Sequence, residues 1–493
     1  MTFLPNKYQR LVYIFIQKGK GNAVIDAVAG SGKSTTIVNA LKLIPQNKKV
    51  LFLAFNKAIV EELKIKVGNL PNVEIRTLHS LGASAVMRQT GAKLSDDKYK
   101  AWVNNGIKYG SLAPRFSNLP DEQLSDWKQN ILHLIDLGRV NLVDNIKDLE
   151  SLAYKHNLDL IDNEASLALA GIDWGKREVD HIDFTDMIYF PNVKQIRMPQ
   201  YDWVFIDECQ DLNAAQREMF LKCIKPGGRF IAVGDPRQAI YGFAGADVES
   251  FNILKNLPHT AKLPLSLCYR CDTDIVDLAK EIVPQLEARA GAGKGVVTRE
   301  ALMKDVQDGD LILCRVSAPL VNLCMKYIGS GIKAYVKGRD IGTNLINMIK
   351  KTNRKQMSDV IERLQRELSR IIGKVVSKQH CTEKEAKGSE MYRVYEDKIN
   401  AIEILSEGLS TAAEVISRID SIFKDGEKNG ICLSTIHKSK GLESDRVFII
   451  CEDKMYLKHC MSIPWMAEQE TNLVYVAYTR AKHYLGFIQD FAL

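Results

Sequence analysis

The stretch Val24–Thr35 reads VIDAVAGSGKST and joins an apolar run of strand length to a loop of small residues. A helix-forming segment, Thr36–Leu41, follows at once. A strand, a small-residue loop and a Gly-Lys-Ser sequence that opens a helix together predict a P-loop, the backbone cradle that binds phosphate groups. One position departs from the simple pattern, because Ala27 stands where its first glycine is expected. The alternative is a glycine-rich turn before a helix, without any phosphate role.

Each residue type in this loop has a physical reason for its place. Gly30 and Gly32 allow backbone N–H groups to turn inward toward phosphate oxygens, and the helix N-terminus adds its positive dipole. We expect Lys33 to reach the β- and γ-phosphates and Ser34 to ligate Mg²⁺, so ATP and Mg²⁺ are the predicted cofactors. The predicted nucleotide-binding residues of the loop are Ala29, Gly30, Ser31, Gly32, Lys33, Ser34 and Thr35.

Two adjacent carboxylates follow another apolar run. Residues 203–206 read WVFI and lead directly into Asp207 and Glu208. Carboxylates at the end of a buried strand are costly unless they serve a purpose. In a P-loop enzyme, Asp207 would hold Mg²⁺ and Glu208 would polarise the attacking water. The alternative is an ordinary polar strand end.

A third apolar run, residues 230–233, precedes a candidate sensor and an aromatic pair. Gln238 follows this run, and its amide would sense the γ-phosphate. Tyr241 and Phe243 come next, spaced by one residue in a glycine-containing loop. Such a pair suits stacking on the bases of a single strand. Burial in a hydrophobic core is the more frequent role of an aromatic pair, and it stays open here.

Apolar runs of strand length recur between helical patterns along the chain. Runs without alternating polar residues indicate strands buried on both faces, as in parallel sheets covered by helices. They fall into one group before residue 262 and another after it, so the predicted fold class is α/β with two domains. The clearest runs are Ala23–Val28, Val50–Ala54, Val204–Ile206, Phe230–Val233, Leu311–Cys314, Ile431–Ser434 and Val447–Cys451.

Two segments lack this pattern and read as helical insertions. The first is polar and helical in character, and the second is rich in lysine and glutamate. In the second, apolar residues recur at helical spacing from Ile361 to Val375, and a solvated helical hairpin without chemistry is its plainest interpretation. The expected domains are 1–90 with 183–262, carrying the insertion 91–182, and 263–345 with 428–493, carrying the insertion 346–427.

The bulk composition is that of a globular protein with several domains. The chain of 493 residues is too long for one core, and 46% apolar with 26% charged residues argues against wholesale disorder. The net charge of +7 fits a nucleic-acid partner without requiring one. No run is apolar and long enough to cross a bilayer, and the run Leu11–Ile16 reads as part of a helix and not as a signal peptide. A cytoplasmic location is therefore expected.

The ten cysteines are scattered, and several lie in apolar strand patterns, as buried free thiols of a reducing compartment do. Cys268 and Cys271 have the Cys-x-x-Cys spacing. No second pair and no matching histidines complete a zinc site, so we expect no metal there.

The order of these motifs resembles that of superfamily 1 helicases of the UvrD/Rep/PcrA type, and the resemblance runs from Gln9 to Arg480. The chain is also similar to phage-encoded and F-box helicase relatives. The resemblance implies two RecA-like domains, 1A and 2A, with helical insertions 1B and 2B. Three positions depart from the family pattern: Cys209 replaces an apolar or aromatic residue, Ala244 an arginine and Cys268 an asparagine.

The resemblance also implies roles for residues that spacing alone does not identify. Gln9 would read adenine, Tyr269 would pack on adenine, and Glu443 would contact the ribose. Arg270 and Arg480 would reach the γ-phosphate as arginine fingers. The implied strand-contacting residues are Phe55, Asn56, Thr77, His79, Tyr241, Phe243, Thr435 and His437.

The predicted function is that of an ATP-driven helicase or translocase, in which a nucleotide held by Lys33 of the first domain and Arg480 of the second drives stepping. The resemblance implies 3′-to-5′ movement and a DNA track. Single-stranded DNA and its junctions with duplex are the expected partners, with no membrane partner. Three alternatives remain: a P-loop ATPase indifferent to DNA, a nucleic-acid binder with a decayed ATPase, and a translocase that displaces proteins without unwinding.

Overall fold

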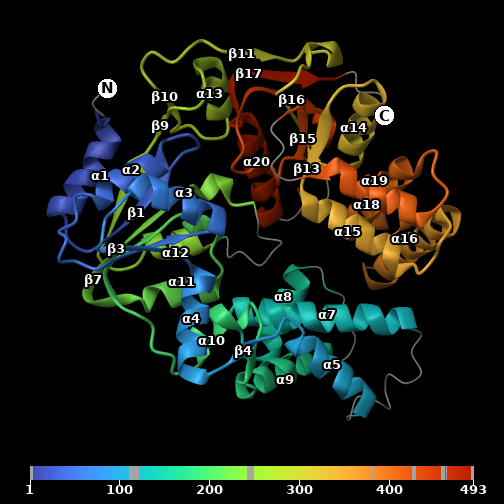
Figure 1. Ribbon diagram of the computed structural model, residues 1–493, viewed down its shortest axis with the longest axis horizontal. Helices are drawn as coiled ribbons and strands as arrows, with labels where there is room; N and C mark the ends of the chain where they lie inside the picture. Colours follow the sequence, from blue (N-terminus) through green and yellow to red (C-terminus); the bar gives the residue numbers. More distant parts are fainter. Residues whose placement is uncertain are drawn as a thin grey trace. The chain divides into compact units, whose positions relative to one another are not determined.

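Two parallel sheets, each with helices packed on it, organise the computed structural model (Figure 1). The chain divides into unit 1, which comprises Met1–Val28 and Gly32–Ser266, and unit 2, which comprises Ala29–Ser31 and Leu267–Leu493. The predicted α/β fold class is therefore confirmed. The structure describes residues 4–109, 121–156, 158, 160, 163–240, 249–379, 382–387, 389–424, 429–456, 461 and 464–489.

The sheet of unit 1 is parallel throughout, and its described strands follow the order β3-β2-β6-β7-β1-β8. Every residue of the inner strands β2 and β6 is buried, which explains their unbroken apolar runs in the sequence. The outer strands β3 and β8 carry exposed polar residues and were not among the predicted runs. The bounds are β1 Asn22–Ala27, β2 Val50–Ala54, β3 Val73–Thr77, β6 Tyr201–Ile206, β7 Ile224–Gly234 and β8 Thr260–Leu265.

Helices cover both faces of this sheet because side chains of each strand alternate between the faces. Phe52 of β2 lies in a core with residues of α1, α2 and α3, whereas its neighbour Leu51 lies in a second core with residues of α4, α11 and α12. The predicted N-terminal helix is confirmed as α1. The bounds are α1 Lys7–Lys18, α2 Lys33–Leu41, α3 Lys57–Val67, α4 Leu78–Thr90, α11 Ala214–Leu221 and α12 Ser250–Lys255, with short 3₁₀ turns at Cys209–Asp211 and Pro236–Gln238.

The segment between α4 and β6 is mainly helical, as predicted for the first insertion. It also contains a short parallel pair, β4 with β5, that the sequence patterns did not indicate. Its helices enclose a core of their own around Trp127, Ile131 and Ile135. The bounds are β4 Lys93–Leu94, α5 Lys98–Tyr109, α7 Asp121–Val140, α8 Ile146–Lys155, α9 Glu164–Arg177, β5 His181–Ile182 and α10 Asp186–Val193.

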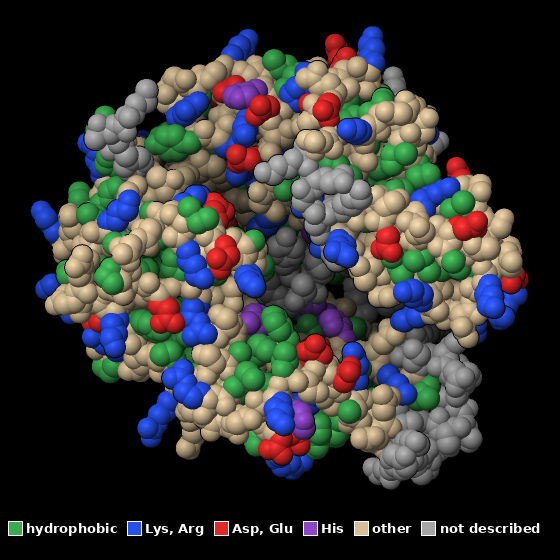
Figure 2. Space-filling model, viewed as in Figure 1, with side chains coloured by type: hydrophobic (Ala, Val, Ile, Leu, Met, Phe, Trp, Pro, Cys, Tyr) green, Lys and Arg blue, Asp and Glu red, His purple; other side chains and the backbone are tan. Residues whose placement is uncertain are grey.

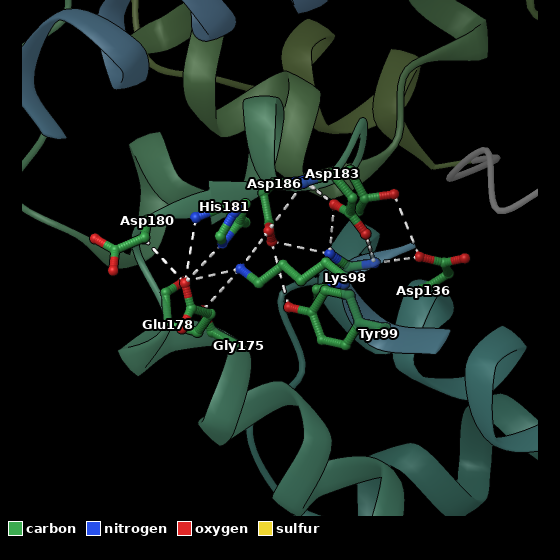
Figure 3. Close-up of polar contacts among 11 residues, drawn as sticks. Lys98, Tyr99, Asp136, Gly175, Glu178, Asp180, His181, Asp183 and Asp186 are labelled. Carbon is green, nitrogen blue, oxygen red and sulfur yellow. Dashed lines mark hydrogen bonds and ion pairs between the residues drawn. The ribbon is translucent and has the colours of Figure 1, made fainter. Parts of the chain in front are cut away.

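A buried ionic network ties these helices to the start of α10 (Figure 3). Asp186, which is fully buried, accepts from Lys98 Nζ at 2.7 Å and from Arg139 Nη1 at 2.9 Å. Arg139 also pairs with Asp183 at 2.8 Å and with Asp136, and Tyr99 Oη lies 3.3 Å from Asp186. Because charges in a low-dielectric interior are costly unless they are paired, the members of this network depend on one another.

We expect Asp186→Ala to destabilise unit 1 strongly, because it leaves Lys98 and Arg139 buried without this carboxylate. Breaking a buried ion pair by removing one partner costs roughly 3–5 kcal/mol. Urea unfolding measures the change. Lys100→Ala is the matched control, since its pair with Asp97 is exposed, and such pairs contribute about 0–1 kcal/mol. Equal midpoints for the two variants would contradict a structural role for the network.

The sheet of unit 2 is also parallel, and its described strands follow the order β11-β17-β16-β12-β15-β13-β14. A two-stranded pair, β9 Leu267–Cys268 with β10 Glu287–Ala288, lies apart from it in the strand pairing. The bounds are β11 Val296–Thr298, β12 Leu311–Cys314, β13 Ala334–Lys337, β14 Phe423–Lys424, β15 Ile431–Thr435, β16 Ser444–Ile450 and β17 Ala481–Ile488.

The second insertion is helical, but it is not the solvated hairpin that the sequence suggested. Leu364 of α16 and Leu405 of α18 are buried in the same hydrophobic core as Ile312 of β12. The interpretation was wrong because the lysine- and glutamate-rich faces dominate the composition while one apolar stripe of each helix is buried. The helices of unit 2 are α13 Thr273–Lys280, α14 Ala318–Gly329, α15 Arg339–Lys351, α16 Met357–Gln379, α17 Glu383–Ala386, α18 Glu390–Ser406, α19 Ala412–Ile422 and α20 Pro464–Tyr478.

Among the described residues, no helix combines the length and the apolar character that crossing a membrane requires. The eight described cysteines are free thiols, six of them buried.

Candidate nucleotide and nucleic-acid sites

The loop before α2 has the backbone conformation that a P-loop needs. Gly30 and Gly32 have φ of 67° and 75°, in the left-handed region that glycine adopts without strain. Gly32 is the N-cap of α2, and Lys33 is its first residue. The hydroxyl of Ser31 is buried without a hydrogen-bond partner among the described residues. A buried hydroxyl of this kind fits a ligand that supplies acceptor oxygens. Of the remaining loop residues, Ser34 is partly buried and Thr35 is exposed.

In unit 1, the predicted catalytic lysine and carboxylates lie together. Lys33 Nζ donates to Glu208 Oε1 at 2.7 Å, and Glu208 is held at a strained positive φ of 51°. Burial, followed by repulsion from Glu208, raises the pKa of Asp207 to about 6. Burial by itself lowers the pKa of Lys33, but attraction to Glu208 and Asp207 outweighs it and raises that pKa. This cluster therefore favours an additional cation beside the carboxylates.

A residue that the sequence patterns did not single out links the two strand ends. Gln210 donates from Nε2 to Glu208 Oε2 at 2.6 Å and accepts from the Asp235 N–H at 3.0 Å. Gln238, the predicted sensor, donates to Asp235 Oδ2 at 2.8 Å. The polar run after residue 206 contains Gln210, but only the strand pairing shows that it reaches the next strand end.

In unit 2, the two predicted arginine fingers lie near each other. Arg480 is almost fully buried, and it donates to the Val476 carbonyl at 2.9 Å, the Leu442 carbonyl at 3.0 Å and the Thr479 hydroxyl at 3.2 Å. No described carboxylate forms an ion pair with it. Burial, and repulsion from Arg270, lower the pKa of Arg480 to about 9. A buried guanidinium without a counterion is suited to an arriving anion.

Arg270 is engaged differently. Its Nε donates to Glu443 at 2.8 Å, and its Nη1 donates to the Thr479 carbonyl at 3.0 Å. The predicted ribose contact, Glu443, thus pairs with the predicted finger Arg270, and Lys482 lies 3.5 Å from the same carboxylate. Although burial opposes it, attraction to Arg270 keeps the pKa of Glu443 below its ordinary value.

Three P-loop residues, Ala29–Ser31, belong to unit 2, and motif residues hold them there. The Ala29 N–H donates to Tyr475 Oη at 2.9 Å, and the Tyr269 N–H donates to the Gly30 carbonyl at 2.8 Å. A Cβ at Gly30 would lie 2.6 Å from Arg270 Cβ, so only glycine fits. Tyr475 was not predicted as a site residue, and its burial inside an apolar helix concealed its hydroxyl's partner. Tyr269, predicted to pack on adenine, is 38% exposed.

The predicted adenine reader, Gln9, is buried and engaged within unit 1. Its Oε1 accepts from the Asn6 N–H at 3.0 Å in the capping box of α1, and its Nε2 donates to Thr36 Oγ1 at 3.1 Å. These two bonds connect the start of α1 to the first turn of α2. Gln9 therefore also has a structural function beside any contact with a base.

The predicted strand-contacting residues of unit 1 follow the carboxyl ends of β2 and β3. Phe55 is 47% exposed, and Asn56 and Thr77 cap α3 and α4 through their side-chain oxygens. His79 stacks on Phe184, with ring centroids 4.0 Å apart and an interplanar angle of 19°. Burial lowers the pKa of His79 to about 4, so the ring is neutral at pH 7.

Phe184 is a residue that the sequence patterns missed. It is 58% exposed, which is unusual for phenylalanine, and it lies about a hundred positions after His79 in the chain. Only the packing of α10 against α4 brings the two rings together. An exposed phenylalanine in a short polar stretch was the available signal.

The remaining strand-contacting predictions fall in unit 2 or outside the described residues. Thr435 is buried at the end of β15, and its hydroxyl accepts from the Lys438 N–H at 3.4 Å. Burial, and then the nearby cation Arg315, lower the pKa of His437 to about 3, so it is neutral at pH 7. Tyr241 and Phe243 lie outside the described residues.

The structure thus brings together two groups of predicted residues. Lys33, Glu208, Asp207 and Gln238 with its partner Asp235 lie in unit 1, whereas Arg270, Glu443 and Arg480 lie in unit 2. Across the part of the chain that the structure describes, no three histidine, cysteine or acidic side chains are grouped as a ready metal site.

Comparison with known proteins agrees with the motif order. The UvrD/REP helicase N-terminal domain matches residues 14–259, and the UvrD-like helicase C-terminal domain matches residues 430–488. The two matches together span well over half of the chain.

Curated relatives of the same type match over most of the chain. F-box DNA helicase protein 1 of Schizosaccharomyces pombe is 25% identical over 93% of this chain and 54% of its own length. A probable DNA helicase II homolog of Mycoplasma genitalium is 24% identical over 72% of this chain and 52% of its length, and ATP-dependent DNA helicase Rep of Buchnera aphidicola is 23% identical over 65% and 51%. The chain spans about half the length of these curated relatives. With both domain matches in the expected order, the chain belongs to the UvrD/Rep helicase family.

Proposed function

We propose that this chain is an ATP-dependent DNA helicase or translocase that moves along single-stranded DNA, in the 3′-to-5′ direction, by hydrolysing ATP. The observation that carries the proposal is the buried Arg480 guanidinium of motif VI, which has no described carboxylate partner and lies beside Arg270. Two cations close together in a protein interior are unfavourable unless an anion joins them. The γ-phosphate of ATP is the anion that this family's chemistry supplies.

Unit 1 offers the complementary half of the chemistry. Lys33 at the first turn of α2 would take up the β- and γ-phosphates, and Glu208 would then be released from Lys33 to orient the attacking water. Gln210 and Gln238 hold Glu208 and Asp235 in a hydrogen-bonded chain that keeps this geometry. We propose that one nucleotide engages Lys33 and both arginines, so that binding and hydrolysis change the relation of the units.

Mg²⁺ fits the donors present. Asp207 and Ser34 would hold it, and the raised pKa of Asp207 reflects carboxylates that lack a compensating cation. When bound, Mg²⁺ neutralises charge on the phosphate oxygens.

Bases of the strand would stack on the exposed rings at the carboxyl edge of the unit 1 sheet. Phe55 and the His79–Phe184 pair supply flat apolar surfaces there, and stacking of this kind is tolerant of sequence. Phe184 joins the predicted strand-contacting set by this reasoning.

The test is the rate of ATP hydrolysis with and without single-stranded DNA, measured beside strand separation on duplexes with 3′ or 5′ tails. We expect strong stimulation by the single strand and unwinding from the 3′ tail. A rate that DNA leaves unchanged would overturn the proposal in favour of a DNA-independent ATPase. Stimulated hydrolysis without strand separation would restrict it to translocation.

We expect Phe184→Ala to weaken binding of single-stranded DNA by about 1–3 kcal/mol, the usual cost of losing one stacked base. Titration of a fluorescent oligonucleotide measures this. Tyr154→Ala is the matched control, because Tyr154 is an aromatic residue of unit 1 that is 87% exposed and has no proposed role. Equal affinities of the two variants would remove Phe184 from the strand path.

A further inference from the structure

A basic pocket of about 1060 Å³ lies in unit 1, away from every motif of the proposed motor. Segments from the α1–β1 turn, the start of β7 and the α12–β8 turn line it. The residues that matter for its chemistry are Lys20, Asn22, Arg229, Lys255, His259 and Lys262. No aspartate or glutamate is among the lining residues.

The pocket lies at the opposite edge of the sheet from the nucleotide and strand residues. Asn22 begins β1 and Thr260 begins β8, whereas the P-loop follows the carboxyl end of β1. Because the strands are parallel, their amino ends share one edge and their carboxyl ends the other. The six residues of β1 separate the edges by about 20 Å. The pocket is therefore a distinct site and not an extension of the ATP site.

The cations of this pocket lack the partners that other partly buried cations have. Lys33, Lys98 and Arg446 each form an ion pair with a carboxylate. None of the five basic pocket residues forms one with a described carboxylate. Lysine and arginine side chains also project from the part of unit 1 that holds α1 and β7, at the left edge of Figure 2.

Arg229 is the most informative of the five. Its Nε donates to the Gly21 carbonyl at 2.6 Å, and its guanidinium lies over the rings of Trp203, 4.2 Å from the centroid, and Phe15, 4.8 Å from the centroid. Burial lowers the pKa of this arginine. A rigidly held, half-buried cation without a counterion costs stability, and an anion would offset that cost.

We propose that this pocket binds the phosphodiester backbone of nucleic acid, as a second contact outside the motor's strand path. Phosphates, and not bases, fit the lining, because it offers cations and an asparagine but no aromatic surface other than the exposed His259. The opening extends over three chain segments, as suits a continuous polyanion more than a single small anion. The net charge of +7 gives the chain the long-range attraction such a ligand needs.

The first experiment compares two doubly substituted full-length proteins. Lys255→Gln/Lys262→Gln removes two pocket charges, and Lys176→Gln/Lys280→Gln removes two exposed charges from other helices. DNA affinity is measured against salt concentration, without nucleotide. We expect the pocket variant alone to lose slope, by about 0.7 per phosphate contact on single strands and 0.9 on duplex. ATP hydrolysis at saturating short oligonucleotide should remain unchanged. Equal slopes for both variants would overturn the proposal.

The second experiment identifies the ligand by hydrogen exchange of the pocket's own peptides. We expect DNA to protect residues 19–22 and 256–262, and the Lys255→Gln/Lys262→Gln protein to lose that protection. Protection by inorganic phosphate but not by DNA would overturn the proposal in favour of a small-anion site. Protection by polyglutamate but not by DNA would overturn it in favour of an acidic protein partner. Neither experiment uses ATP hydrolysis as its readout, so its failure is distinguishable from failure of the motor assignment.

Discussion

Replacing Lys33 with alanine is expected to lower the rate of ATP hydrolysis by at least about 10²–10³-fold, which is the usual effect of removing one preorganised group that stabilises charge in a transition state. Lys33 opens α2, where the helix dipole also favours phosphate, and its ammonium is held by Glu208 at 2.7 Å. Loss of the side chain removes the phosphate contact and leaves Glu208 nearer to Asp207 without a compensating charge. A steady-state phosphate-release assay measures the rate.

The same variant should bind single-stranded DNA almost as tightly as the unchanged protein. The proposed strand contacts, Phe55, His79 and Phe184, follow other strands of the sheet and do not involve Lys33. Lys42→Ala is the matched control, because Lys42 is exposed at the opposite end of α2. Hydrolysis at the unchanged rate in Lys33→Ala would contradict the assignment of the P-loop.

Arg480→Ala is expected to reduce hydrolysis by a factor on the order of 10³–10⁵, the effect of arginine fingers in related phosphoryl transfer. The fold should tolerate this change better than burial alone suggests. Arg480 donates to the carbonyls of Val476 and Leu442 and forms no ion pair with a described carboxylate, so its removal leaves no buried charge uncompensated. A large loss of rate with a small change in thermal midpoint is therefore the expected signature.

Two further variants separate catalysis from structure at this position. Arg480→Lys keeps the charge but lacks the planar fork, and we expect a rate intermediate between alanine and arginine. Arg446→Ala removes an arginine of the same unit that pairs with Asp310 at 3.1 Å, and hydrolysis should persist. If Arg480→Ala hydrolysed ATP as fast as Arg446→Ala does, unit 2 would have no part in the reaction.

Continuous apolar runs predicted the centres of both sheets. The predicted runs Val50–Ala54 and Leu311–Cys314 coincide with β2 and β12, because strands covered on both faces must be apolar throughout. The edge strands β3 and β8 are exposed in part, so their sequences, VEIRT and TAKLPL, contain charges that hide them. The second insertion was misread for the opposite reason, since its charged faces outweigh a narrow buried stripe.

The site residues divide along a similar line. Residues adjacent in the chain, such as those of the P-loop, form one loop whose backbone conformation follows from glycine placement. The order of motifs identified the family, which the domain matches bear out. The roles of the individual residues remain predictions that the variants above address.

For this protein, local sequence alone was sufficient for the phosphate loop, the buried parallel strands and the succession of motifs, because each depends on neighbouring residues and on the period of the strand or helix. Tertiary structure alone decided which polar groups acquire partners. Gln210 reaches Asp235, Phe184 meets His79, and Arg480 remains buried without a described carboxylate. These outcomes depend on packing between segments far apart in the chain, and on the cost of charge in a low-dielectric interior, which no local pattern encodes.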